Sequence, residues 1–130
     1  MTDHPDLELL DACQKSNAES VKLLLASGAS ANARSALNGY SALHYAATRG
    51  SLEIVRMLVA AGADIHYRDS TVHGSPLSSA VISGKIEVVR FLLSKGADTS
   101  ETLFPDNKSL IDEAQTNGDV EIVALLRRNE

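Results

Sequence analysis

Hydrophobic residues recur along the chain in short blocks with helical spacing, and each block closes on a glycine. In the stretch 52–59 apolar residues are separated by three, four and seven positions, which predicts one apolar face of a short amphipathic helix. This pattern ends at Gly62, and glycine readily takes the left-handed conformation that closes a helix. A second block, from about Ser41 to Arg49, stops at Gly50. The spacing therefore predicts two short helices in this part of the chain.

The same pair of blocks recurs with a step of 34 residues. Two glycine series keep this step: Gly28, Gly62 and Gly96, and Gly50, Gly84 and Gly118. Three apolar columns and one acidic column share it: Val21, Val55, Val89 and Val123; Leu24, Leu58, Leu92 and Leu126; Leu23, Met57, Phe91 and Leu125; Glu19, Glu53, Glu87 and Glu121. Two helices this short cannot bury enough apolar surface alone, so the copies must stack into one elongated core.

The motifs within each copy distinguish between two repeat families of similar length. A step near 34 also suits tetratricopeptide repeats, but these lack the roughly ten residues, such as 68–74, that separate the helical pairs here. The stretch 40–47, YSALHYAA, is similar to the ankyrin signature T-P-L-H-x-A, and GSPLSSA at 74–80 matches it with Ser78 where His44 stands. Both are followed by G-x-L/I-E-I/V-V-R-x-L. The chain therefore resembles the ankyrin repeat family.

This resemblance implies an all-α solenoid of ankyrin repeats, in which paired antiparallel helices are joined by β-hairpin fingers. It implies a single domain over 1–130, with repeats at about 5–34, 36–68, 70–102 and 104–130. The first and last copies are degenerate, as LLDAC at 9–13 and SLIDEA at 109–114 show, and we interpret them as capping repeats with one face toward water. Charged residues at both ends favour a monomer.

Composition and charge narrow the classes of partner. Hydrophobic residues make up 44% and charged residues 22% of the chain, as in ordinary globular domains. The net charge is −5, and no basic cluster exceeds the pair Arg127–Arg128, which argues against nucleic acid as a partner. Apolar runs are too short for a membrane helix, and Cys13 is the single cysteine. We therefore expect a cytoplasmic protein with no membrane contact.

The histidines and the cysteine are the candidates for chemistry. The resemblance implies that the ring of His44 ties finger and helix together by hydrogen bonds. His66 and His73 flank the second finger with Asp69, but no helical H-x₃-H pair and no cysteine partner supports a metal site.

His66 also falls in the column of Asn32, where ankyrin repeats usually carry a loop-bracing asparagine. Cys13 aligns with Ala47 in a small-residue position, so we expect a buried, unreactive thiol. No catalytic set and no cofactor is predicted.

A partner would sit on the concave side, which in ankyrin stacks is formed by the fingers and the exposed parts of the first helices. Mapping by column assigns these positions to it: Arg34, Leu37, Asn38, Tyr40, Tyr45, Thr48, Arg49, Arg68, Asp69, Thr71, His73, Ile82, Ser83 and Phe104. Tyr45 lies in a column that can be half-buried. Binding energy concentrates on tyrosine, tryptophan and arginine anchors, so Tyr40, Arg49 and Arg68 are the first candidates.

The predicted function is a non-catalytic protein–protein interaction module, acting as a stand-alone adaptor or inhibitor of a partner protein. An alternative is a dedicated regulator, or immunity-type inhibitor, of one co-encoded enzyme or toxin. The acidic balance of the chain would suit a basic partner of that kind. An enzyme of unknown class is the remote alternative.

Overall fold

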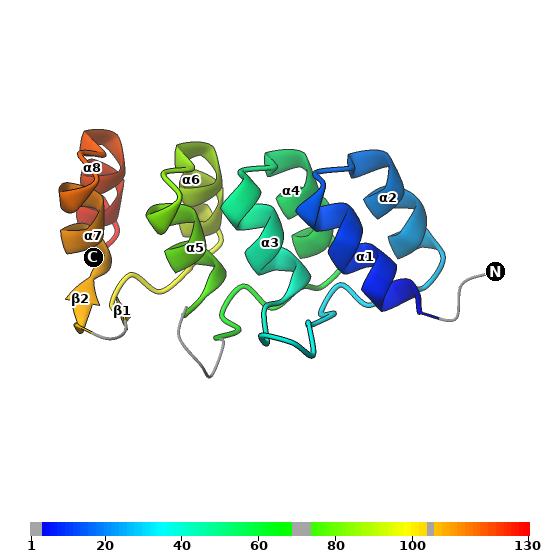
Figure 1. Ribbon diagram of the computed structural model, residues 1–130. Helices are drawn as coiled ribbons and strands as arrows, with labels where there is room; N and C mark the ends of the chain where they lie inside the picture. The colour runs from blue at the N-terminus through cyan, green and yellow to red at the C-terminus, as the bar shows by residue number, and fades with distance from the viewer. Residues whose placement is uncertain (1–3, 69–73, 104–105) are drawn as a thin grey trace.

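The computed structural model describes residues 4–68, 74–103 and 106–130, and this part of the chain forms a row of helix pairs (Figure 1). The helices are α1 (Pro5–Gln14), α2 (Ala18–Ala26), α3 (Ala42–Arg49), α4 (Leu52–Ala60), α5 (Pro76–Ile82), α6 (Ile86–Ser94), α7 (Leu110–Thr116) and α8 (Val120–Arg128). Two short strands, β1 (Thr102–Leu103) and β2 (Lys108–Ser109), precede α7.

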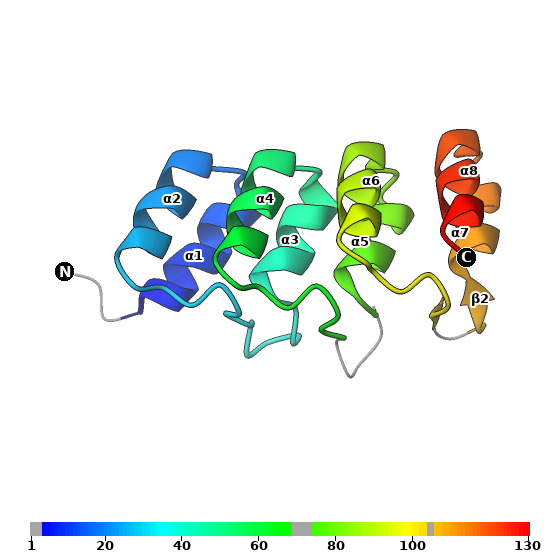
Figure 2. The ribbon, with the colours of Figure 1, turned by 180° about the vertical axis from the view of Figure 1, so that it is seen from behind.

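The helices lie in two layers. Helices α1, α3, α5 and α7 form one layer, and α2, α4, α6 and α8 form the other, as the front and back views show (Figures 1 and 2). Each helix contacts its neighbours in its own layer as well as its partner in the pair. The segments between pairs all extend on one side of the stack (Figure 1). The all-α ankyrin solenoid expected from the repeat pattern is confirmed.

Local signals in the sequence set the helix ends. Ser41 caps α3 by accepting a hydrogen bond from the backbone of His44, and Gly50 ends the helix with a φ of 76°. Ser75 caps α5, and Pro76 occupies its first turn, where the missing N–H costs no hydrogen bond. Helix α3 begins and ends where the sequence predicts.

The columns of Val55 and Leu58 form the core, with half-buried members at the two ends of the stack. The third apolar column lies at the edge of the core instead: Leu23 is 59% exposed, and Met57 and Phe91 are half-buried. Val21, Val55 and Val89 are fully buried, whereas Val123 is half-buried. Beyond α8 the described chain places no further helix pair against it, so Val120 on that helix is 79% exposed. The burial of each helix pair depends on the pair stacked next to it, as expected for a repeat protein in which each repeat contacts only its neighbours.

The fingers contain less strand than a full hairpin. Strands β1 and β2 pair antiparallel over two residues each, with Thr102 opposite Ser109. The first finger has an isolated bridge between Arg34 and Ser41, closed by a hydrogen bond of 2.8 Å from Ser35 N–H to the carbonyl of Tyr40. A turn over residues 36–38 lies between the two residues of this bridge.

Candidate functional site

His44 joins the second helix pair to the third. Its ring is 1% exposed, and Nε2 lies 2.7 Å from the carbonyl oxygen of Gly74, just before α5. A carbonyl oxygen only accepts, so Nε2 carries the proton and Nδ1 is left as an acceptor. The backbone N–H of Ser41 donates to Nδ1 at 3.3 Å, and the Ser41 hydroxyl lies 2.7 Å from the same atom. The structural role expected for His44 is confirmed.

All three tyrosines of the chain gather around this histidine. Tyr40 stacks on His44 with ring centroids 5.7 Å apart, and Tyr45 meets Tyr40 edge-on at 5.6 Å. Tyr67 meets His44 edge-on at 5.7 Å and donates its hydroxyl to the carbonyl of Gly39 at 2.9 Å. Edge-to-face and offset rings are favourable arrangements. The rings therefore connect the first two fingers to α3.

Five of the residues predicted to bind a partner form a strip on the second repeat, in which Tyr45 is half-buried and the other four are exposed. Asn38 in the finger donates to the hydroxyl of Tyr45 on α3 at 3.1 Å. Thr48 and Arg49 follow Tyr45 at i+3 and i+4, on the same face of the helix. Leu37 is 96% exposed in the finger. We call Leu37, Asn38, Tyr45, Thr48 and Arg49 the second-repeat strip; it combines an apolar side chain, an aromatic ring and a cation.

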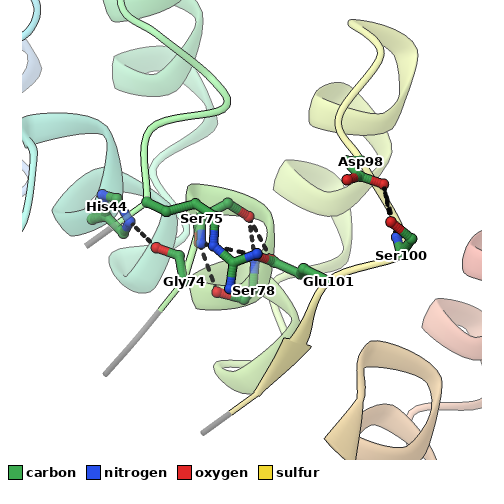
Figure 3. A network of polar contacts seen from close by, with 8 residues as sticks. His44, Gly74, Ser75, Ser78, Asp98, Ser100 and Glu101 are labelled. Atoms are coloured by element: carbon green, nitrogen blue, oxygen red, sulfur yellow. Dashed lines mark hydrogen bonds and ion pairs between the residues drawn. The ribbon is translucent and has the colours of Figure 1, made fainter. Parts of the chain in front are cut away.

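A buried carboxylate lies between the third and fourth pairs (Figure 3). The side chain of Glu101 is 3% exposed and accepts from the Ser75 hydroxyl at 2.5 Å and from the Ser75 backbone N–H at 3.2 Å. Nη1 of Arg68 lies 3.4 Å from Oε2 of the same carboxylate. Buried carboxylates require such partners, because an unpaired charge in the interior is costly. Glu101 therefore links the segment after α6 to the beginning of α5.

Glu101 and Ser75 connect the segments on either side of the third helix pair. Ser78 stands one repeat after His44, and its hydroxyl donates to the carbonyl of Ser75 at 2.7 Å, within the same helix end. Glu101 reaches back from the segment after α6 to this helix end. The sequence analysis missed this residue, although an acid in the column of Ala33 and Tyr67 was the available signal.

Asn32 braces the turns that precede the fingers. Its Nδ2 donates to the carbonyl of Gly62 at 3.2 Å, and its Oδ1 accepts from the backbone N–H of Asp64 at 2.8 Å. One repeat later, Asp98 accepts from the backbone N–H of Ser100 at 2.9 Å and from its hydroxyl at 2.7 Å. These hydrogen bonds, together with the nearby His66 and Arg68, lower the pKa of Asp98 below its usual value.

Two hollows related by the repeat step lie between successive finger segments. The first has a volume of about 270 Å³ and is lined by Asn32, Arg34, Ser41, Asp64 and Tyr67. The second has a volume of about 80 Å³ and is lined by Ile65, His66, Arg68, Ser75, Asp98 and Glu101. Each lining residue of the first hollow has its counterpart 34 positions later in the second. The sequence analysis placed Arg34 and Arg68 on the surface but did not identify either hollow.

The predicted partner-binding residues fall into three groups. Seven are exposed: Arg34, Leu37, Asn38, Thr48, Arg49, Arg68 and Ile82. Three are half-buried: Tyr40, Tyr45 and Ser83. Asp69, Thr71, His73 and Phe104 lie outside the described residues. The half-burial of Tyr45 was anticipated, whereas the contact of Arg68 with Glu101 was not.

The remaining candidates for chemistry are of a structural kind. Cys13 is fully buried, and burial raises the pKa of its thiol to about 12, so the thiol is protonated at neutral pH. Within residues 4–68, 74–103 and 106–130, no three His, Cys, Asp or Glu side chains are grouped as metal ligands would be. Two residues of the metal site considered from the sequence, Asp69 and His73, lie outside these ranges. No helix in these ranges has both the length and the hydropathy needed to cross a bilayer.

Comparison with known proteins identifies the family. A family model for ankyrin repeats matches residues 9–103 as three copies, which is most of the chain. A search of curated proteins found no match. The matched range ends in β1, and the pair α7–α8 continues the stack beyond it. Ankyrin repeats are generally protein–protein interaction modules and are typically non-catalytic. The chain belongs to the ankyrin repeat family.

Proposed function

We propose that the chain is a non-catalytic adaptor or inhibitor that binds a partner protein through the finger and first-helix side. The second-repeat strip carries this proposal, because it places exposed Leu37 and Arg49 on either side of Tyr45. Tyrosine and arginine are enriched among the residues that dominate binding energy. Tyr45 is already positioned by its hydrogen bond with Asn38, so little side-chain freedom is lost on binding.

The contacts of Tyr40, Arg49 and Arg68 change which of these residues we expect to contribute most to binding. Arg68 is held by the buried carboxylate of Glu101, so its charge is already compensated. Tyr40 stacks on His44 and supports the finger. Arg49 is exposed at the end of α3 and forms no ion pair within the described residues. We therefore propose Arg49 and Tyr45 as the leading contacts.

The location of the acidic residues favours an adaptor over a dedicated inhibitor of a basic enzyme. The repeated glutamates lie in exposed first turns of the outer helices, away from the fingers: Glu19, Glu53, Glu87 and Glu121. A basic partner steered by the net charge of −5 would meet these helices rather than the second-repeat strip. The co-encoded regulator therefore stays the second candidate.

The proposal includes a cytoplasmic monomer that binds neither nucleic acid nor membrane. It also includes one domain over 1–130 with the four repeats divided as the sequence suggests. Sedimentation of the purified chain measures the oligomeric state, and a dimer at micromolar concentration would contradict the monomer.

Charge reversal on the strip tests the proposed surface. Partners are captured on the immobilised chain from cells that express it and quantified by mass spectrometry, with Arg49→Glu beside Lys22→Glu. Lys22 is an exposed cation on the outer helix α2, so it controls for the loss of positive charge. Arg49→Glu should weaken capture of the specific partner about tenfold or more, because a hot-spot arginine is worth about 2 kcal/mol.

Equal capture by both variants would contradict binding through the strip. Circular dichroism must show native helicity for each variant, so that lost capture reports the interface and not unfolding. Tyr40 is left unchanged in this experiment, because its removal would disturb the stack on His44.

A further inference from the structure

We propose that the first hollow, beside Arg34 and Tyr67, binds a carboxylate side chain of the partner protein. The inference rests on the proposed function, since it assigns the partner a chemical feature: an aspartate or glutamate that enters between the first two finger segments. Two observations support it: the surroundings of Arg34, and the contrast between the two hollows within this chain.

Arg34 is a cation that the described residues leave uncompensated. Its guanidinium lies 4.9 Å from the centroid of the Tyr67 ring, and it forms no ion pair with any residue in the described ranges. Stacking on a neutral ring is attractive but does not cancel the charge. The ring lies against the guanidinium carbon, and no described residue accepts a hydrogen bond from the Arg34 N–H groups, so a carboxylate can bind them.

The second hollow shows what this arrangement accepts. There Arg68 and Ser75, the counterparts of Arg34 and Ser41, hold the carboxylate of Glu101. In the first hollow Tyr67 stands at the position of Glu101, so no carboxylate occupies that position beside Arg34, and none of the described residues forms an ion pair with it. The partner would provide the group that the chain itself provides one repeat later.

Asp64 in the first hollow is an acid of this chain, and the second hollow shows that such an acid is compatible with a further carboxylate. Oδ1 of Asp64 accepts from the backbone N–H of His66 at 2.9 Å, so one oxygen is already engaged. Its counterpart Asp98 lines the second hollow together with Glu101, and both carboxylates lie near Arg68 there. Two acids around one arginine therefore already coexist in this fold.

The size of the first hollow fits a single side chain. Its volume of about 270 Å³ exceeds the roughly 80 Å³ left in the second hollow, where Glu101 is one of the lining residues. Pockets for small-molecule ligands generally measure about 300–1,000 Å³ and are mainly apolar. The first hollow is smaller and is lined mainly by polar side chains. A side-chain carboxylate is the ligand of matching size and charge.

Titration with a small carboxylate tests the hollow without knowledge of the partner. The probe is N-acetyl-L-glutamic acid α-amide, and the neutral control is N-acetyl-L-glutamine α-amide. In ¹⁵N NMR spectra of the full chain, the acid should shift the Nε–H of Arg34 and the side-chain amide of Asn32 with saturation at millimolar concentration. The glutamine probe should not. Arg34→Gln should abolish the shifts at Asn32, and Arg68→Gln should preserve them.

Peptide selection then connects the hollow to partner binding. Peptides selected from a displayed random library should carry one acidic residue whose change to its amide weakens binding about tenfold, as loss of a charge-assisted hydrogen bond predicts. With Arg34→Gln, the acid and amide peptides should bind equally. Arg68→Gln should keep the preference, because Arg68 is occupied by Glu101.

The outcomes separate the two proposals. Absent or charge-independent shifts in the titration would overturn the carboxylate site. Selected peptides whose acid preference survives Arg34→Gln would overturn it too, while leaving the proposed function intact. Loss of partner capture in Arg49→Glu, together with unchanged capture in Arg34→Gln, would likewise retain the binding surface and remove the hollow from it.

Discussion

Glu101 and Ser75 are 26 positions apart, yet the carboxylate of one accepts a hydrogen bond of 2.5 Å from the hydroxyl of the other. Ser75 lies in the segment after α4 and Glu101 in the segment after α6, so this contact connects two neighbouring repeats of the stack. In a repeat protein, stability arises from each repeat and from the interfaces between neighbours. A buried polar contact at such an interface therefore influences both layers.

The first prediction concerns this contact. Glu101→Gln should lower the free energy of unfolding by about 1–3 kcal/mol, because the charged acceptor of two Ser75 donors is lost in the interior. Glu87→Gln is the matched control: Glu87 also pairs with an arginine, Arg90, but at an exposed site. Exposed pairs contribute about 0–1 kcal/mol. Urea denaturation measures both variants, and equal losses would contradict the role of Glu101.

The second prediction concerns the tie made by His44. His44→Ala should lower the free energy of unfolding by about 2–4 kcal/mol, because the buried carbonyl of Gly74 loses its donor and the ring leaves a void. His66→Ala, at an exposed position, should change it by no more than about 0.5 kcal/mol. Chemical denaturation of both variants provides the measurement. A His44 variant as stable as the His66 variant would show that the tie is dispensable.

The third prediction separates the core from the surface. Leu58→Ala should destabilise the chain by about 2–5 kcal/mol, since Leu58 is fully buried between layers. Leu37→Ala removes the same atoms from a side chain that is 96% exposed and should leave the thermal midpoint nearly unchanged. Thermal denaturation followed by circular dichroism compares the two. If Leu37→Ala lowered the midpoint as much, Leu37 would belong to the fold and not to the surface.

The fourth prediction concerns Cys13 and alkaline pH. Burial raises the thiol pKa from 9.0 to about 12, so above pH 9 the unfolded chain loses this proton while the folded chain retains it. The stabilisation is therefore complete below pH 9 and declines as the pH rises toward 12. By pH 10 the loss is about 1 kcal/mol. Urea denaturation at pH 7 and pH 10 should show a larger decline for the native chain than for Cys13→Ala. Parallel declines would mean that the thiol ionises in the folded state.

The repeat architecture was predictable because it depends on periodic apolar residues and glycines. Val55 and Val89 occupy equivalent buried positions because residues 34 apart face equivalent neighbours in a stack. Gly50 and Ser41 end and begin α3 through local backbone preferences that need no knowledge of the remaining fold. Val123 is only half-buried because the described chain places no further helix pair against α8. The repeat pattern alone predicts the same burial for every member of its column.

The candidate site was predictable only in part. Exposure of Arg34, Leu37 and Arg49 follows from their columns. The contact of Arg68 with Glu101 does not, because it joins the finger of one repeat to the segment after the next outer helix. Alignment of the repeats shows which positions are equivalent. It does not show which side chains from two different columns come into contact.

The sequence by itself determined the stack: the repeat step and the helix ends. These features come from local conformational preference and from periodic burial, and both can be read along a single chain. Only the tertiary structure decided that Tyr40, Tyr45 and Tyr67 gather around His44, and that among the described residues Glu101 narrows one hollow while its counterpart beside Arg34 is larger. The reason is geometric, because these contacts form between neighbouring repeats. The distances and directions between their side chains depend on how the repeats pack and not on their order along the chain.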